Sequence, residues 1–135
     1  MGWPAKKIER SDLSLVRRAR KILEKNDSFL LVFDVKGSKN WNATIGLEEL
    51  YRRVDEFCRK VTKIYKKNIV RGERTGSSYF ESFIRIIGDG GGGYFNSAEV
   101  ITEIMALAHK ELYPIEFWWN VAEDIWDEEN SRIIS

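Results

Sequence analysis

Two apolar segments, each followed by an aspartate close to glycine, constrain the fold of this chain more than any other feature. The first covers residues 29–33 and is followed by Asp34, with Gly37 three positions later. The second covers residues 84–87 and is followed by Gly88 and Asp89. Apolar runs of this length are typical of buried strands, and glycine after such a run indicates a turn. We therefore expect two strands that each present a carboxylate near their end.

Helical periodicity predicts three helices around these strands. Apolar residues recur three and four positions apart over residues 11–25 and again over residues 47–64. A third such pattern follows Ser97, which we expect to cap the helix, and it ends before Pro114. Residues 37–44 and 66–78 lack a sustained period and are expected to be loops.

The order of predicted elements indicates an α+β fold. Residues 79–87 and 94–95 are expected to form a hairpin around the glycine run, and residues 115–121 form a last strand. Without its first helix, the chain reads β-α-β-β-α-β. This order predicts a ferredoxin-like domain, with a four-stranded antiparallel sheet, two helices on one face and an extra N-terminal helix. Because the first strand and the hairpin are neighbours in that topology, we expect Asp34 to lie close to Asp89.

The composition fits one soluble domain. We interpret residues 1–135 as a single unit, with an N-terminal helix (11–25), a ferredoxin-like core (28–122) and a C-terminal tail (123–135). The single cysteine, Cys58, excludes an internal disulfide framework, indicates a reducing compartment and is expected to be buried. No apolar run approaches the roughly 18 residues of a membrane span, so we expect a cytoplasmic protein without membrane contact. The absence of glutamine beside 32% charged residues favours a thermophilic source.

Two carboxylates at neighbouring strand ends are suited to hard divalent cations, and these cations bind nucleotide phosphates. We expect Asp34 and Asp89 to be metal ligands and catalytic groups, with Mg²⁺ or Mn²⁺ as cofactor and the Val35 carbonyl as a further ligand. The predicted partner is a nucleoside triphosphate, because backbone N–H groups and cations follow Asp34. The expected phosphate-binding residues are Lys36, Gly37, Ser38, Lys39, Arg71, Arg74, Gly88 and Gly90.

These two segments also resemble a known family. Residues 33–38, with Asp34, Gly37 and Ser38, are similar to the first metal-binding segment of class III nucleotidyl cyclases, and residues 87–89 are similar to their second. The resemblance implies a palm-type fold, ATP or GTP as ligand, Mg²⁺ or Mn²⁺ as cofactor, and a homodimer. It implies metal ligation by Asp34 and Asp89, phosphate contacts from Gly37 and Ser38, and, in an active form, nucleotidyl cyclase or nucleotidyltransferase activity.

Two alternatives of other classes stay open. Residues 1–75 hold 19 Lys and Arg against 10 Asp and Glu, whereas residues 76–135 hold 3 against 11. The basic half is typical of a non-enzymatic module that binds RNA or DNA, with Arg17, Arg18, Arg20 and Lys21 on the first helix. It equally fits a homo-oligomeric interaction protein, in which this helix meets the acidic third helix of a second copy, or a fold in which the two halves compensate each other.

The aromatic residues near the predicted site have two readings. Trp118 and Trp119 lie in the last predicted strand, and we interpret both as packing or interface anchors rather than base-stacking residues. Trp41 follows the first carboxylate by seven positions, and the sequence favours neither packing nor nucleotide contact for its ring.

Overall fold

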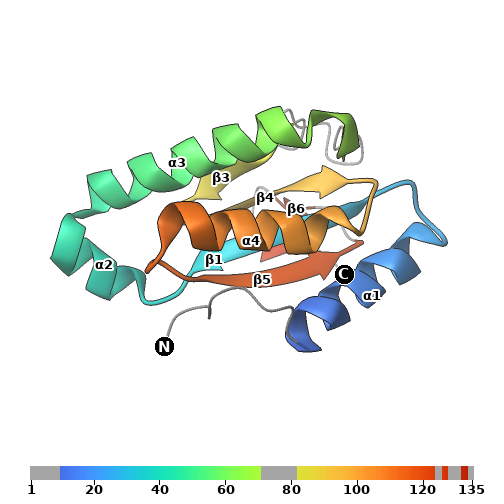
Figure 1. The fold of residues 1–135 in the computed structure, drawn as a ribbon, viewed down its shortest axis with the longest axis horizontal. Helices are drawn as coiled ribbons and strands as arrows, with labels where there is room; N and C mark the ends of the chain where they lie inside the picture. Colours follow the sequence, from blue (N-terminus) through green and yellow to red (C-terminus); the bar gives the residue numbers. More distant parts are fainter. Residues whose placement is uncertain (1–9, 71–81, 124–125, 128–131, 134–135) are drawn as a thin grey trace.

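The computed structural model describes residues 10–70, 82–123, 126–127 and 132–133 (Figure 1). Its elements are α1 (Arg10–Leu23), β1 (Phe29–Val35), α2 (Ser38–Ile45), α3 (Leu47–Ile64), the 3₁₀ turn η1 (Lys66–Asn68), β2 (Ile69–Val70), β3 (Ile84–Ile87), β4 (Gly90–Phe95), α4 (Val100–Leu112), β5 (Phe117–Ala122), β6 (Trp126–Asp127) and β7 (Arg132–Ile133). The described part is an α+β fold.

The main sheet has five antiparallel strands. Its order is β2-β4-β1-β5, and β3 pairs with the same edge of β4 as β2 does, further along the strand. β1 therefore lies in the middle, with Leu30 opposite Tyr94 on one side and opposite Ala122 on the other. β6 and β7 form a separate two-stranded sheet. This order is compatible with the expected arrangement, although the main sheet has five strands rather than four because residues 69–70 add a short strand.

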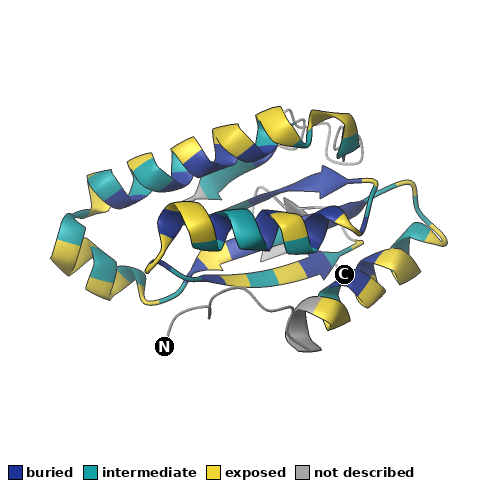
Figure 2. Cartoon of the chain, in the orientation of Figure 1, coloured by how far each residue is buried: buried dark blue, intermediate teal, exposed yellow. Residues whose placement is uncertain are grey.

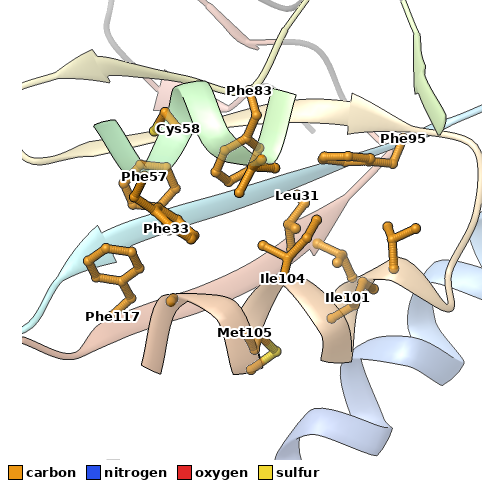
Figure 3. Packing of buried hydrophobic residues seen from close by; sticks show 14 of the residues in the cluster. Leu31, Phe33, Phe57, Cys58, Phe83, Phe95, Ile101, Ile104, Met105 and Phe117 are labelled. Carbon is orange, nitrogen blue, oxygen red and sulfur yellow. The ribbon is translucent and has the colours of Figure 1, made fainter. Parts of the chain in front are cut away.

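One face of the sheet carries the core. α3 and α4 lie over this face, in front of the sheet in Figure 1. Alternate residues of β1 point into it, namely Phe29, Leu31, Phe33 and Val35, and all are buried. Figure 3 shows the rings of Phe33, Phe57, Phe83 and Phe117 together, and the centroids of Phe33 and Phe117 are 5.0 Å apart. Burial of this aromatic cluster is the main stabilisation that the fold offers its sheet.

The helices follow from their apolar periodicity. α3 buries Leu50, Val54, Phe57, Cys58 and Val61, spaced three and four residues apart, whereas its other side is exposed (Figure 2). α4 buries a similar stripe against the sheet. α1 lies beside α4 and the edge strand β5, where Val16 and Ala19 join the core. The predictions of helices over 11–25, 47–64 and after Ser97 therefore agree closely with α1, α3 and α4, although the Ser97 side chain makes no cap hydrogen bond and α4 begins at Val100.

Three expectations need correction. Residues 38–45 form the helix α2 rather than a loop, because Gly37 adopts φ +63° and turns the chain, and Trp41 and Ile45 then pack against the core. The glycine run is not an open hairpin tip, since only Gly88 and Asp89 lie in the turn and residues 90–93 belong to β4. The strand expected over 79–87 is described only as β3, and residues 79–81 lie outside the described residues.

Within the described ranges, no helix combines the length and the apolar character that crossing a bilayer requires.

Candidate functional site

The carboxyl groups of Asp34 and Asp89 lie within hydrogen-bonding reach of each other. Asp34 is the next-to-last residue of β1, and Asp89 occupies the turn between β3 and β4. The register explains their proximity, because Phe33 of β1 pairs with Gly91 of β4 and Asp34 and Asp89 continue from this pair. Two residues 55 positions apart are thus placed side by side by antiparallel pairing.

Electrostatics make this pair costly when both groups are charged. The pKa of Asp34 is raised above its usual value of 3.8, first by partial loss of hydration and then by the hydrogen bond and the charge of Asp89. The Val35 backbone N–H donates to the Asp34 carboxylate and partly opposes this rise. Two carboxylates at such short range favour either a shared proton or a bound cation between them.

The hairpin tip that holds Asp89 is itself anchored to α3. Arg85 of β3 donates from Nε to Asp55 Oδ1 at 2.8 Å and from Nη2 to Asp55 Oδ2 at 3.2 Å. Its Nη1 donates to the Gly88 carbonyl at 2.6 Å, and its guanidinium lies 4.3 Å from the centroid of the Tyr51 ring. A single arginine therefore fixes the residue directly before Asp89. This charged network raises the pKa of Arg85, so the anchor stays cationic.

The segment after Asp34 leads directly into α2. Gly37 is the N-cap residue in the left-handed conformation, and Ser38 and Lys39 form the first turn of the helix. In the described part of the chain, no side chain makes a cap hydrogen bond at this end of α2. Backbone N–H groups in the first turn of a helix attract anions. The predicted phosphate-binding residues 37–39 therefore lie on a helix N-terminus three residues beyond the Asp34 carboxylate.

Lys36 has a defined contact in this structure. Its backbone N–H donates to the Glu116 carbonyl at 2.8 Å, and its Nζ lies 4.1 Å from the centroid of the Trp118 ring. The side chain is therefore directed along the surface of the sheet toward β5, on the same side of the molecule as the carboxylate pair. A phosphate contact from Lys36 would require it to leave this ring.

One buried carboxylate oxygen of the acidic pair supports a bound divalent cation. Asp89 Oδ2 is buried and receives no hydrogen bond within the part of the chain that the structure describes. A buried carboxylate oxygen without a donor is costly unless a proton or a cation satisfies it. The described ranges gather no cluster of three or more His, Cys, Asp or Glu side chains, so a cation here would take its other ligands from backbone, water or phosphate oxygens. A ligand role for the Val35 carbonyl remains a prediction.

The other expected contacts are distributed unevenly. Gly88 and Gly90 flank Asp89, so both lie at the site. Arg71 and Arg74 lie outside the described residues. The neighbouring glycine Gly91 serves the sheet, since a Cβ atom there would lie 2.1 Å from the Ile84 carbonyl oxygen. At Gly92 a Cβ atom would lie 2.2 Å from the Leu31 carbonyl oxygen, so close strand pairing rather than ligand access explains these two glycines.

Sequence reasoning missed Arg85, and of its two readings for Trp118 the structure excludes only packing in the core. Arg85 interrupts an apolar strand, and a charged residue at that position indicates a specific partner, so this signal in the sequence could have identified it. Trp119 packs against Phe33 and Phe117 as expected, but Trp118 is 64% exposed. Trp41 is half-buried against the core, which favours the packing reading for its ring.

The surface charges bear on the two alternatives. Arg20 of α1 pairs with Glu99 at 2.8 Å, and Arg18 donates to the Asn120 side chain. Lys60 of α3 pairs with Glu111 of α4 at 2.6 Å. Basic residues from the first half of the chain therefore meet acidic and polar residues of the second half inside one fold. The pairing of the first helix with the acidic residues of the third predicted helix, expected between two copies, is formed within the chain by Arg20 and Glu99.

A separate hollow of about 750 Å³ lies between α3 and β3. Its lining includes Arg85, Asp55 and the buried Cys58, but none of the residues predicted for the nucleotide site. Burial raises the pKa of the Cys58 thiol well above its usual range, so this cysteine is an uncharged core residue as expected.

No protein-family model matches this sequence, and no significantly similar curated protein or solved structure was found.

Proposed function

We propose that this chain is a palm-like, ferredoxin-like domain that binds a nucleoside triphosphate through a divalent cation held by Asp34 and Asp89. The observation that carries the proposal is the paired carboxyl groups, which come from distant segments and leave Asp89 Oδ2 buried with no donor among the described residues. A carboxyl group whose pKa is raised by burial and by a second carboxyl group beside it is a feature of functional sites more than of structural surfaces. The strand order and the two helices on one face support the ferredoxin-like arrangement.

Mg²⁺ or Mn²⁺ would supply charge neutralisation for the phosphates and would polarise them toward displacement. The residues of this chain then have separate roles. Asp34 and Asp89 hold the cation, the N–H groups of residues 37–39 donate hydrogen bonds to phosphate oxygens, and Lys36 or Lys39 compensates the remaining negative charge. Arg85 keeps the tip in place through the Gly88 carbonyl. Nucleotidyl cyclase or nucleotidyltransferase activity is the reaction class that this arrangement suits.

The nucleic-acid alternative has weaker support. Arg18 and Arg20, two of the four basic residues that it assigned to the first helix, are engaged with Asn120 and Glu99. Their availability to a phosphate backbone is lower than the sequence implied.

A titration with Mn²⁺ tests the proposal directly, with electron paramagnetic resonance measuring the concentration of the free ion. We expect the wild-type chain to bind one Mn²⁺, with affinity enhanced by ATP or GTP analogues, and Asp34→Asn and Asp89→Asn each to weaken binding at least tenfold. Asp27→Asn is the matched control, because Asp27 is exposed at the opposite end of β1. Equal Mn²⁺ binding by the wild type and both site variants would refute the proposed site.

A further inference from the structure

Trp118 lies beside the carboxylate pair on the sheet face opposite to α3 and α4. In the register between β1 and β5, Trp118 pairs directly with Asp34. Residues directly opposite each other in an antiparallel pair have their side chains on the same face, with Cβ atoms about 5 Å apart. Its neighbours Phe117 and Trp119 point into the core instead. The indole and the Asp34 carboxylate are thus adjacent on one surface.

The exposure of this indole is not explained by packing. Trp118 is 64% exposed, the highest value among the large hydrophobic residues that are exposed in the described part, whereas Phe117 beside it is 2% exposed. Among the described residues, Lys36 contacts this ring by a cation–π interaction, with its Nζ 4.1 Å from the centroid. An exposed tryptophan next to a functional site is typical of a surface that receives a planar or apolar group.

The contact with Lys36 links the ring to the phosphate-binding segment. Lys36 is anchored by its backbone to Glu116 and directly precedes Gly37, the N-cap of α2. The carboxylate pair, the ammonium group of Lys36 and the exposed ring of Trp118 are therefore neighbours in space. The ligand that matches all three has a metal-binding polyphosphate at one end and a planar ring at the other.

We propose that Trp118 is the stacking platform for the base of the bound nucleotide, with Lys36 leaving the ring to pair with phosphate as the base takes its place. This inference rests on the proposed function, because the cation at Asp34 and Asp89 positions the phosphates. Stacking on an aromatic ring tolerates any base, so the platform alone predicts similar affinity for ATP and GTP. Lys36 makes a cation–π contact with the ring face in the free protein and an ion pair with the phosphates in the complex.

The test compares nucleotides with a ligand that has no base. Calorimetric titrations in Mn²⁺ would use non-hydrolysable ATP and GTP analogues and inorganic tripolyphosphate. We expect Trp118→Ala to weaken both nucleotides on the order of tenfold and tripolyphosphate less than twofold, and Trp118→Phe to retain most of the affinity. Ile64→Ala is the control, because Ile64 is an exposed apolar residue at the far end of α3. Lys36→Gln should weaken all three ligands.

The outcomes separate this inference from the proposed function. If Mn²⁺ and tripolyphosphate bind, but Trp118→Ala binds nucleotides as tightly as the wild type, the stacking platform is overturned and the proposed function is not. Absence of Mn²⁺ and tripolyphosphate binding would overturn both proposals. If Trp118→Ala instead abolishes self-association in sedimentation while nucleotide affinity is unchanged, the exposed indole is a contact between two copies and the platform is wrong.

Discussion

The two faces of the main sheet differ in chemistry although the same strands build both. On the face covered by α3 and α4, β1 contributes four buried apolar side chains that contact a cluster of phenylalanines. On the other face, Leu30 packs with Tyr94 in a small cluster, and the strand then ends with the exposed Asp34 beside Trp118. Burial therefore decreases toward one end of the second face, and the candidate site lies at that end. The apolar packing that stabilises the sheet is concentrated on one face, and the polar groups of the candidate site lie at the end of the other.

The largest expected effect is a difference in stability between two variants, each of which removes one aromatic side chain from one face of the main sheet. Phe33→Ala removes a ring that contacts Phe83, Phe117 and Trp119, and we expect the free energy of unfolding to fall by about 3–5 kcal/mol. Trp118→Ala removes a mostly exposed ring and should change it by less than about 1 kcal/mol. Urea denaturation followed by circular dichroism measures both. Similar losses for the two variants would contradict the division between the faces.

The next effect concerns β4, the strand that joins the Asp89 tip to the middle of the sheet. Gly91→Ala would place a Cβ atom 2.1 Å from the Ile84 carbonyl oxygen, which is backbone and unable to rotate away. We expect a loss of about 2–3 kcal/mol in unfolding free energy. Gly93→Ala is the matched control, since its closest atom would lie at 3.0 Å, and it should cost less. The explanation by close strand pairing fails if Gly91→Ala is the milder of the two.

Arg85 connects the helix-covered side to the tip that carries Asp89. Arg85→Met keeps much of the apolar stem but removes the bonds to Asp55 and to the Gly88 carbonyl, and we expect a loss of about 1–2 kcal/mol in thermal or chemical unfolding. Mn²⁺ affinity should fall with it, because the tip loses its anchor. Asp55→Asn keeps the Gly88 contact available and should retain more Mn²⁺ affinity. An Arg85→Met variant that is destabilised but binds Mn²⁺ normally would limit Arg85 to a structural role.

The smallest expected effect is a gain in stability rather than a loss, and it concerns Asp34. A carboxyl group whose pKa is raised by folding contributes stability below its unfolded pKa, and this contribution is lost as the pH rises through the folded value. Because the pKa of Asp34 is raised from 3.8, the charged pair opposes folding at neutral pH. We expect Asp34→Asn to raise the melting temperature by about 1–3 °C at pH 7, and the gain to shrink as the pH falls toward 4. A pH-independent difference, or a loss of stability at pH 7, would show that the pair is not strained.

Much of the fold could be predicted because the relevant signals are local. The helix over residues 47–64 was predicted with the bounds that α3 has, since its apolar spacing continues for five turns. The helix α2 was missed because Asn40, Asn42 and Thr44 are weak helix formers, and the helix depends on packing of Trp41 and Ile45. Likewise, the consecutive aromatic residues in β5 do not alternate between apolar and polar side chains, so the sequence does not indicate which tryptophan faces the core.

By itself the sequence determined the order of strands and helices and the position of an aspartate near the end of β1 and in the turn before β4. Apolar periodicity and glycine positions are properties of short segments, and the order of elements that they give predicted, through the ferredoxin-like topology, that strand pairing brings these two residues together. Only the tertiary structure decided that Arg85 anchors the tip, that Arg20 meets Glu99 within the chain and that Trp118 is exposed beside Asp34. The physical reason is that the contacts of Arg85 with Asp55, of Arg20 with Glu99 and of Trp118 with Asp34 join residues 30 to 84 positions apart through strand register and side-chain geometry, which no single segment encodes.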